Sequence, residues 1–135
     1  MMQFSRKQKQ QIRKIAQKYD LELILLFGSR VEGKIHKESD FDVAYSSSRD
    51  LGLMEEAQLI VDLAPVFQSE NIDLANLKKV NPLLLYGIIK DCRILYEKKA
   101  LAFASLRAYA FKKYVETKPL YEEKYKRLQE TVKML

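Results

Sequence analysis

Helices are predicted where apolar residues recur at intervals of three and four, so that they share one face of a helix. Three segments in the first two thirds of the chain have this pattern: Ser5–Tyr19, Leu53–Phe67 and Pro82–Asp91. Asn81 stands directly before the third segment as a candidate N-cap. Residues 98–135 are also helical in pattern, and Pro119 should break or kink this last helix because proline lacks the backbone donor.

Strands are predicted from short runs that are mostly apolar or that alternate between apolar and polar residues. Four runs have this character: Leu21–Phe27, Phe41–Tyr45, Asn71–Leu77 and Arg93–Tyr96. They alternate with the predicted helices along the chain. The sequence therefore predicts an α/β (α+β) fold, a small mixed β-sheet flanked by helices, with a long or proline-kinked C-terminal helix.

Length and composition are those of one ordinary globular domain. The chain has 135 residues, of which 47% are hydrophobic and 31% charged. We expect a single domain, residues 1–135, with a core of residues 1–97 and a C-terminal helical segment of residues 98–135. The apolar runs are too short to span a bilayer, and the charged N-terminus lacks the apolar stretch of a signal peptide. The one cysteine, Cys92, has no partner for an internal disulfide. These features favour a cytoplasmic protein.

The net charge of +6 is distributed unevenly along the chain. Lys and Arg outnumber Asp and Glu by six to one in residues 1–20 and by ten to four in residues 98–135, but residues 21–97 contain eight basic and thirteen acidic residues. A nucleic-acid-binding protein usually places its basic residues on the reading surface. The acidic centre argues against direct nucleic-acid binding and suits a divalent cation, although solvated surface carboxylates would give the same count.

Two aspartates stand at the start of the second predicted strand, in the sequence Asp40-Phe41-Asp42. Residues i and i+2 of a strand point to the same face, so the two carboxylates lie side by side and Phe41 faces the other way. A divalent cation relieves their repulsion, and Mg²⁺ suits such oxygen ligands. A polar strand face at a solvent edge would explain the same pair without a metal.

A glycine and a serine follow the first predicted strand. Gly28 permits a tight turn and the close approach of a ligand to the backbone. If Ser29 opens a short helix, the free N–H groups there form an anion site, and the Ser29 hydroxyl and the Arg30 guanidinium could each meet a phosphate oxygen. A plain strand–turn–helix with Ser29 as N-cap is the alternative.

A third carboxylate, Asp73, lies between Ile72 and Leu74 in the third predicted strand. An acidic residue is out of place there unless it faces a polar site or the surface. Three carboxylates on adjacent strands could hold two metals, or one metal and a polarised hydroxyl. Such a site suits in-line attack on a nucleotide phosphate.

Three features of the sequence together resemble the nucleotidyltransferase superfamily of the DNA polymerase beta type. They are the Gly-Ser-Arg motif after one strand, the Asp-Phe-Asp motif about ten residues later, and a further aspartate in a later strand. Within it, the short chain is similar to the minimal nucleotidyltransferase (MNT) domains, the antitoxin partners of HEPN-domain toxins. The resemblance implies that Gly28, Ser29 and Arg30 bind the nucleotide. It also implies that Asp40, Asp42 and Asp73 are catalytic and bind the metal.

The resemblance also implies a function. The chain would be an Mg²⁺-dependent nucleotidyltransferase, a protein adenylyltransferase that moves AMP from ATP to a tyrosine hydroxyl of a HEPN RNase toxin and so neutralises it. Because residues 98–135 leave no second domain for the acceptor, a protein partner should bring it, in a hetero-oligomer with the toxin. Two alternatives stay open: an antitoxin that neutralises by binding alone, and a small-molecule (antibiotic-type) nucleotidyltransferase that acts as a dimer.

The C-terminal segment has a narrow apolar seam with spacings of four, three, four and three, the kind that one helix offers to another. Its residues are Tyr121, Tyr125, Leu128, Val132 and Leu135. Basic side chains lie off the seam. We expect the seam to contact the partner; packing against the protein's own sheet is the alternative.

Overall fold

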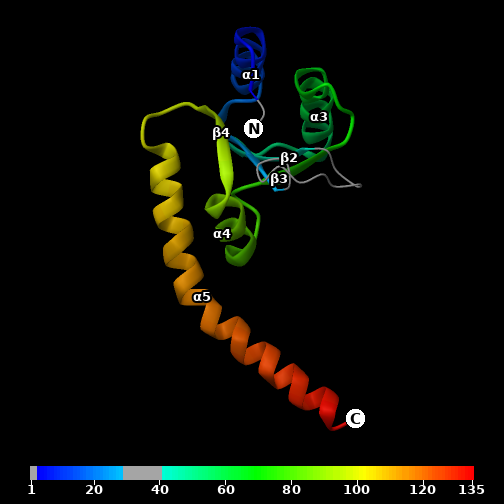
Figure 1. Ribbon diagram of the computed structural model, residues 1–135, viewed down its shortest axis with the longest axis vertical. Coiled ribbons are helices and arrows are strands. Elements are labelled where there is room, and N and C mark those ends of the chain that lie inside the picture. Colours follow the sequence, from blue (N-terminus) through cyan, green and yellow to red (C-terminus); the bar gives the residue numbers. More distant parts are fainter. Residues whose placement is uncertain (1–2, 29–40) are drawn as a thin grey trace.

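The computed structural model of the chain describes residues 3–28 and 41–135 (Figure 1). Its helices and strands follow in chain order: α1 (Arg6–Lys18), β1 (Leu21–Phe27), β2 (Phe41–Ser47), α3 (Leu53–Phe67), β3 (Ile72–Asn76), α4 (Pro82–Lys90), β4 (Cys92–Glu97) and α5 (Ala102–Lys133). The predicted helices and strands are thereby confirmed, and β1 and α3 have the predicted bounds. Asn81 is the N-cap of α4, since its side chain accepts a hydrogen bond from the Leu84 N–H.

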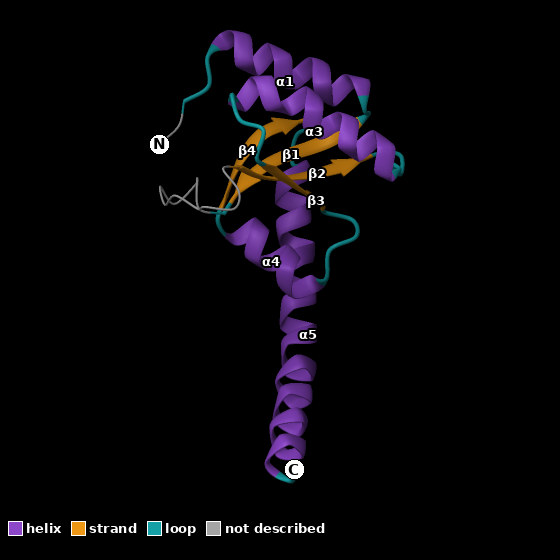
Figure 2. Ribbon diagram, turned by 90° about the vertical axis from the view of Figure 1, so that its right-hand side faces the viewer, coloured by secondary structure: helices purple, strands orange, loops and turns teal. Residues whose placement is uncertain are grey.

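The strands of the described residues form one mixed sheet in the order β3-β2-β1-β4. β1 runs antiparallel to both β2 and β4, whereas β2 and β3 are parallel. Helices cover both faces: α1 and α3 lie on one, and α4 with the first part of α5 lies on the other (Figure 2). The predicted small mixed sheet flanked by helices is confirmed.

Each face of the sheet has its own apolar core. Phe41, Val43 and Tyr45 of β2 are buried in the core beneath α1 and α3. Ala44, between them, is buried in the core beneath α4 and α5. Because successive strand residues alternate between faces, Asp42 shares the α4–α5 side with Ala44.

The predicted long C-terminal helix is confirmed: α5 continues through Pro119, so of the two effects expected of this proline, a break or a kink, the break does not occur. Proline removes one backbone donor, but a helix of 32 residues keeps its hydrogen bonds on both sides of that position. The carbonyl left without a donor is that of Val115, a residue 53% exposed, where water can hydrate it. Figure 1 shows the ribbon bending in its middle part rather than ending there.

The first part of α5 packs on the domain, where Ala110 is fully buried and Phe103 and Leu106 join the second core. The rest of the helix projects away from the sheet in both views (Figures 1 and 2). Within the described residues, no helix combines the length and apolarity that a membrane crossing requires.

Candidate active site

The predicted site residues that the structure describes meet at one end of the sheet, where β1 ends and β2 and β3 begin. Phe27, the last residue of β1, is the register partner of Asp42. Asp42 in turn is the register partner of Asp73 in the parallel strand β3. Gly28, Asp42 and Asp73 are therefore neighbours, although 45 positions of sequence separate the first from the last.

Gly28 occupies a position that only glycine fits. Its φ is +81°, in the left-handed region that side-chain-bearing residues rarely adopt. A Cβ atom built there would lie 2.3 Å from Oδ2 of Asp42, well inside contact distance. The turn after β1 thus brings bare backbone against the Asp42 carboxylate, and a side chain at position 28 would displace it.

Asp42 and Asp73 place two carboxylates on the same side of adjacent strands. Ile72 and Leu74 pack in the core beneath α1 and α3, while Ala75 packs beneath α4, so Asp73 faces the α4–α5 side, as Asp42 does. Neighbouring strands are about 4.8 Å apart, close enough for one cation to be bound by both groups. Asp42 is half-buried and Asp73 is exposed at the sheet edge. Two neighbouring carboxylates, beside a glycine whose backbone carries no side chain, offer the oxygen ligands that Mg²⁺ prefers.

The other predicted site residues, Ser29, Arg30 and Asp40, lie outside the described residues. Among the residues that the structure does describe, no group of three or more His, Cys, Asp or Glu side chains forms a complete metal site. The roles assigned to all six site residues therefore stay predictions.

Cys92 is a neighbour of this site that the sequence did not single out. It is the register partner of Phe27 on the other side of β1, and it is half-buried rather than a full core residue. Burial and the nearby Asp91 carboxylate raise the pKa of its thiol to about 11, so the group is neutral near pH 7 and unsuited to nucleophilic attack. Its place beside the site depends on the β1–β4 pairing, for which no local signal exists.

Comparison with protein families identifies the chain. A model of the family described as Polymerase beta, Nucleotidyltransferase matches residues 10–101, about two thirds of the sequence. The chain belongs to this nucleotidyltransferase family. The matched span contains every predicted site residue, and the predicted superfamily membership is confirmed. No curated protein matches the sequence.

Solved structures share the fold of this nucleotidyltransferase over most of its length. A crystal structure of a toxin–antitoxin with AMP-PNP has 21% sequence identity and a TM-score of 0.75, and the match covers 90% of this chain and 98% of the other. A structure of the tri-AMPylated Shewanella oneidensis HEPN toxin in complex with MNT antitoxin has 18% identity and a TM-score of 0.71, with 91% and 97% covered. The toxin–antitoxin MntA-HepT matches at 18% identity and a TM-score of 0.71, with 93% and 99% covered.

Proposed function

We propose that this protein is an Mg²⁺-dependent nucleotidyltransferase that transfers AMP from ATP to a tyrosine hydroxyl of a HEPN-type toxin and so acts as its antitoxin. The observation that carries the proposal is the register of Asp42 with Asp73 directly beside the left-handed Gly28. The family match and the likeness to toxin–antitoxin structures support it. Such an antitoxin would work in the cytoplasm, in a hetero-oligomer with the toxin.

The transfer forms one bond and breaks one. The tyrosine oxygen bonds to the α-phosphorus of ATP, the bond from that phosphorus to the pyrophosphate group breaks, and the hydroxyl proton leaves to a base. Mg²⁺ held by Asp40, Asp42 and Asp73 would offset the charge that develops on the phosphate oxygens. Gly28 leaves the backbone open to the phosphates, and Ser29 and Arg30 would bind their oxygens.

The exposure of Asp73 suggests the side from which the acceptor arrives. β3 is an edge strand, and Asp73 is exposed near its start. A tyrosine hydroxyl of another protein can therefore reach this carboxylate without displacing a helix. Asp73 would complete the metal site and help to take up the proton of the acceptor.

The partner would also meet the apolar seam of α5. Tyr125, Leu128 and Val132 are each at least 60% exposed, so the alternative that the seam packs on the protein's own sheet is wrong. Exposed apolar residues in a continuous helical stripe are typical of a protein–protein contact.

A neutralisation assay separates this function from binding alone. The purified HEPN partner is assayed as an RNase after incubation with the wild type or with Asp42→Asn, each with Mg²⁺ and ATP and each with EDTA. We expect lasting neutralisation only with wild type, Mg²⁺ and ATP together. Equal neutralisation by Asp42→Asn, or in EDTA, would favour an antitoxin that acts by contact. Transfer of AMP to an added antibiotic, without partner, would favour the small-molecule enzyme.

A further inference from the structure

A pocket of about 570 Å³ lies between α4, α5 and the start of β4. The side chains that matter in it are Tyr86, Lys90, Cys92, Phe103, Arg107 and Phe111. Its size is within the range of pockets that hold cofactor-sized ligands, about 300–1,000 Å³. We call it the α4–α5 pocket.

The α4–α5 pocket borders the candidate active site. Cys92, in its wall, pairs with Phe27, the residue before Gly28. Phe27 and Cys92 both pack in the core beneath α4 and α5, the side on which Asp42 and Asp73 also lie. From the spacing of strands, the pocket begins about 5 Å from the end of β1 and about 10 Å from β2. A molecule with its phosphates at Gly28 can thus extend into the pocket.

The chemistry of the wall suits a flat aromatic group attached to an anion. Phe103, Phe111 and Tyr86 supply aromatic surface, and Lys90 and Arg107 supply positive charge. The Arg107 guanidinium lies 6.0 Å from the centre of the Phe103 ring. Among the described residues, no carboxylate lines the pocket. Aromatic and guanidinium planes are the surfaces on which proteins stack nucleobases.

The surroundings of Gly28 differ on its β3 side and its β4 side, and this difference indicates where the nucleoside of the substrate would bind. On the β3 side, Asp73 is exposed and open to an acceptor. On the β4 side, the α4–α5 pocket is an open groove bordered by two helices and a strand. We propose that the α4–α5 pocket binds the nucleoside of the nucleotide substrate, with Phe103 and Arg107 in contact with the base. This inference rests on the proposed nucleotidyltransferase function.

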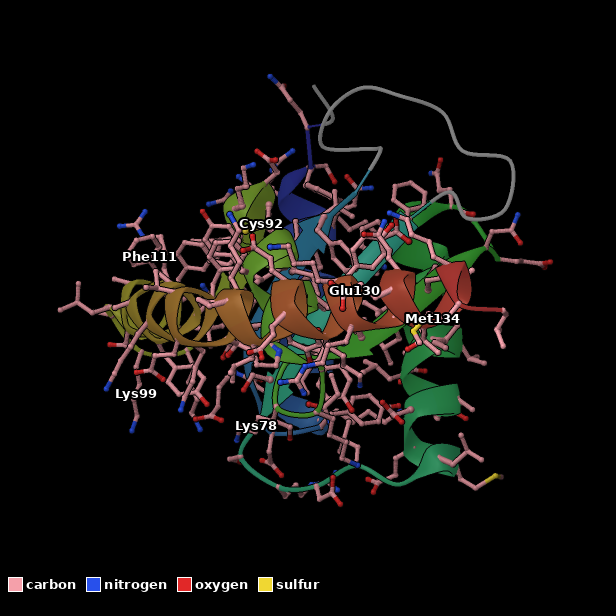
Figure 3. All side chains as sticks on the ribbon, turned by 90° about the horizontal axis from the view of Figure 1, so that it is seen from below. Lys78, Cys92, Lys99, Phe111, Glu130 and Met134 are labelled. Carbon is pink, nitrogen blue, oxygen red and sulfur yellow. The ribbon has the colours of Figure 1, made fainter. Side chains whose placement is uncertain are left out.

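A second, smaller hollow of about 280 Å³ on α5 offers matched controls. It is lined by Lys78 of the β3–α4 loop and by Tyr109 and Lys113 of α5, among others. Figure 3 shows Cys92 and Phe111 on one side of α5 and Lys78 on the other. Substitutions at Tyr109 and Lys113 thus alter the same helix but not the α4–α5 pocket.

The first test compares ATP with inorganic tripolyphosphate, which lacks the nucleoside, in binding titrations with Mg²⁺. We expect Arg107→Ala to weaken ATP binding about tenfold and to leave tripolyphosphate binding unchanged. Lys113→Ala should change neither. Arg107 is exposed, so its removal should not unfold the chain. Equal loss for both ligands would make Arg107 a phosphate ligand and overturn the assignment, as would no loss for ATP.

Tryptophan and thiol reporters locate the ligand without relying on affinity. The chain has no tryptophan and one cysteine, so Ala104→Trp and the Cys92 thiol are unique probes of the pocket. ATP should quench Ala104→Trp and slow alkylation of Cys92 at pH 9, whereas tripolyphosphate should do neither. Tyr109→Trp, in the second hollow, should respond to neither ligand. Identical responses of the pocket probes to ATP and tripolyphosphate would refute the proposal.

The proposed function and this inference fail in different ways. If the wild type binds neither ligand in Mg²⁺, or if Asp42→Asn binds both as tightly as the wild type, the catalytic assignment itself is wrong. Suppose instead that Asp42→Asn weakens the binding of both ligands, while Arg107→Ala binds ATP as tightly as the wild type and the pocket probes do not respond to ATP. Then only the nucleoside assignment is wrong. Variants of the pocket that bind ATP normally but no longer modify the partner would show that a partner side chain occupies it instead.

Discussion

Gly28→Ala should damage both stability and activity, because a Cβ at this position meets two obstacles. The left-handed backbone costs a residue with a side chain roughly 1–2 kcal/mol. The new Cβ would also lie 2.3 Å from Oδ2 of Asp42 and must move apart to an ordinary contact of at least 3.4 Å. Such overpacking commonly costs about 1–3 kcal/mol more. We expect the free energy of unfolding to fall by about 2–5 kcal/mol in urea titrations.

The same displacement predicts the effect on catalysis. Moving the Asp42 carboxylate by about 1 Å should lower the turnover of ATP about a hundredfold, since misplacement on that scale has such an effect. Gly87→Ala is the matched control: it lies on the exposed face of α4 with nothing within 4 Å of a new Cβ. It should raise stability by about 0.5–1 kcal/mol and leave turnover unchanged.

A double-mutant cycle separates backbone strain from the contact with Asp42. In an Asp42→Ala background the carboxylate is gone, so Gly28→Ala should cost only the roughly 1–2 kcal/mol of strain. Unfolding in urea of the wild type, both single variants and the double variant gives the coupling energy. If Gly28→Ala costs the same in both backgrounds, the two residues do not crowd one another. If Gly28→Ala costs no stability in either background, the left-handed backbone assigned to Gly28 is also wrong.

Three further changes test other parts of the chain. Ser29→Ala should weaken tripolyphosphate binding by about 1 kcal/mol, the net contribution of one hydrogen bond; a loss of several kcal/mol or none would refute its role. Truncation after Pro119 should leave a folded protein that binds Mg-ATP but cannot modify its partner; undiminished modification would refute the seam as an interface, and unfolding would show that it supports the core. Although burial raises the pKa of Asp62, hydrogen bonds from Lys18 and Tyr19 hold it below its usual value, so the carboxylate stabilises the fold above its unfolded pKa. Asp62→Asn should therefore lower the free energy of unfolding at neutral pH, and the difference from wild type should shrink as the pH falls below about 4, through the lowered pKa of the folded state; a constant difference would contradict this.

Local patterns predicted the secondary structure well, because each element is recognisable on its own. The run Leu21–Phe27 is mostly apolar and is followed by a glycine, and Asn81 caps the helix that comes directly after it. Pro119 does not break α5, because the proline removes only one backbone donor and the helix keeps its hydrogen bonds on both sides of it. Propensity at a single position does not outweigh the cooperativity of a long helix.

The site was predictable in its residue types but not in its geometry. That Asp42 lies in register with Asp73 depends on the parallel pairing of β2 with β3, which no local pattern specifies. The approach of Asp42 to Gly28 depends on the antiparallel β1–β2 register. The position of Cys92 beside the site likewise depends on β4 joining the other edge of β1. These contacts are tertiary, so sequence spacing alone does not encode them.

The intact mass of the HEPN partner after incubation with this protein, Mg²⁺ and ATP tests the central claim most directly. We expect the partner to gain mass in steps of one AMP on a tyrosine, with pyrophosphate released in equal amount. Asp42→Asn should slow this gain about a hundredfold or more, since charge stabilisation in the transition state is lost. A partner that stays at its original mass while being neutralised, or that gains AMP equally fast with Asp42→Asn, would contradict a catalytic site at the end of β1.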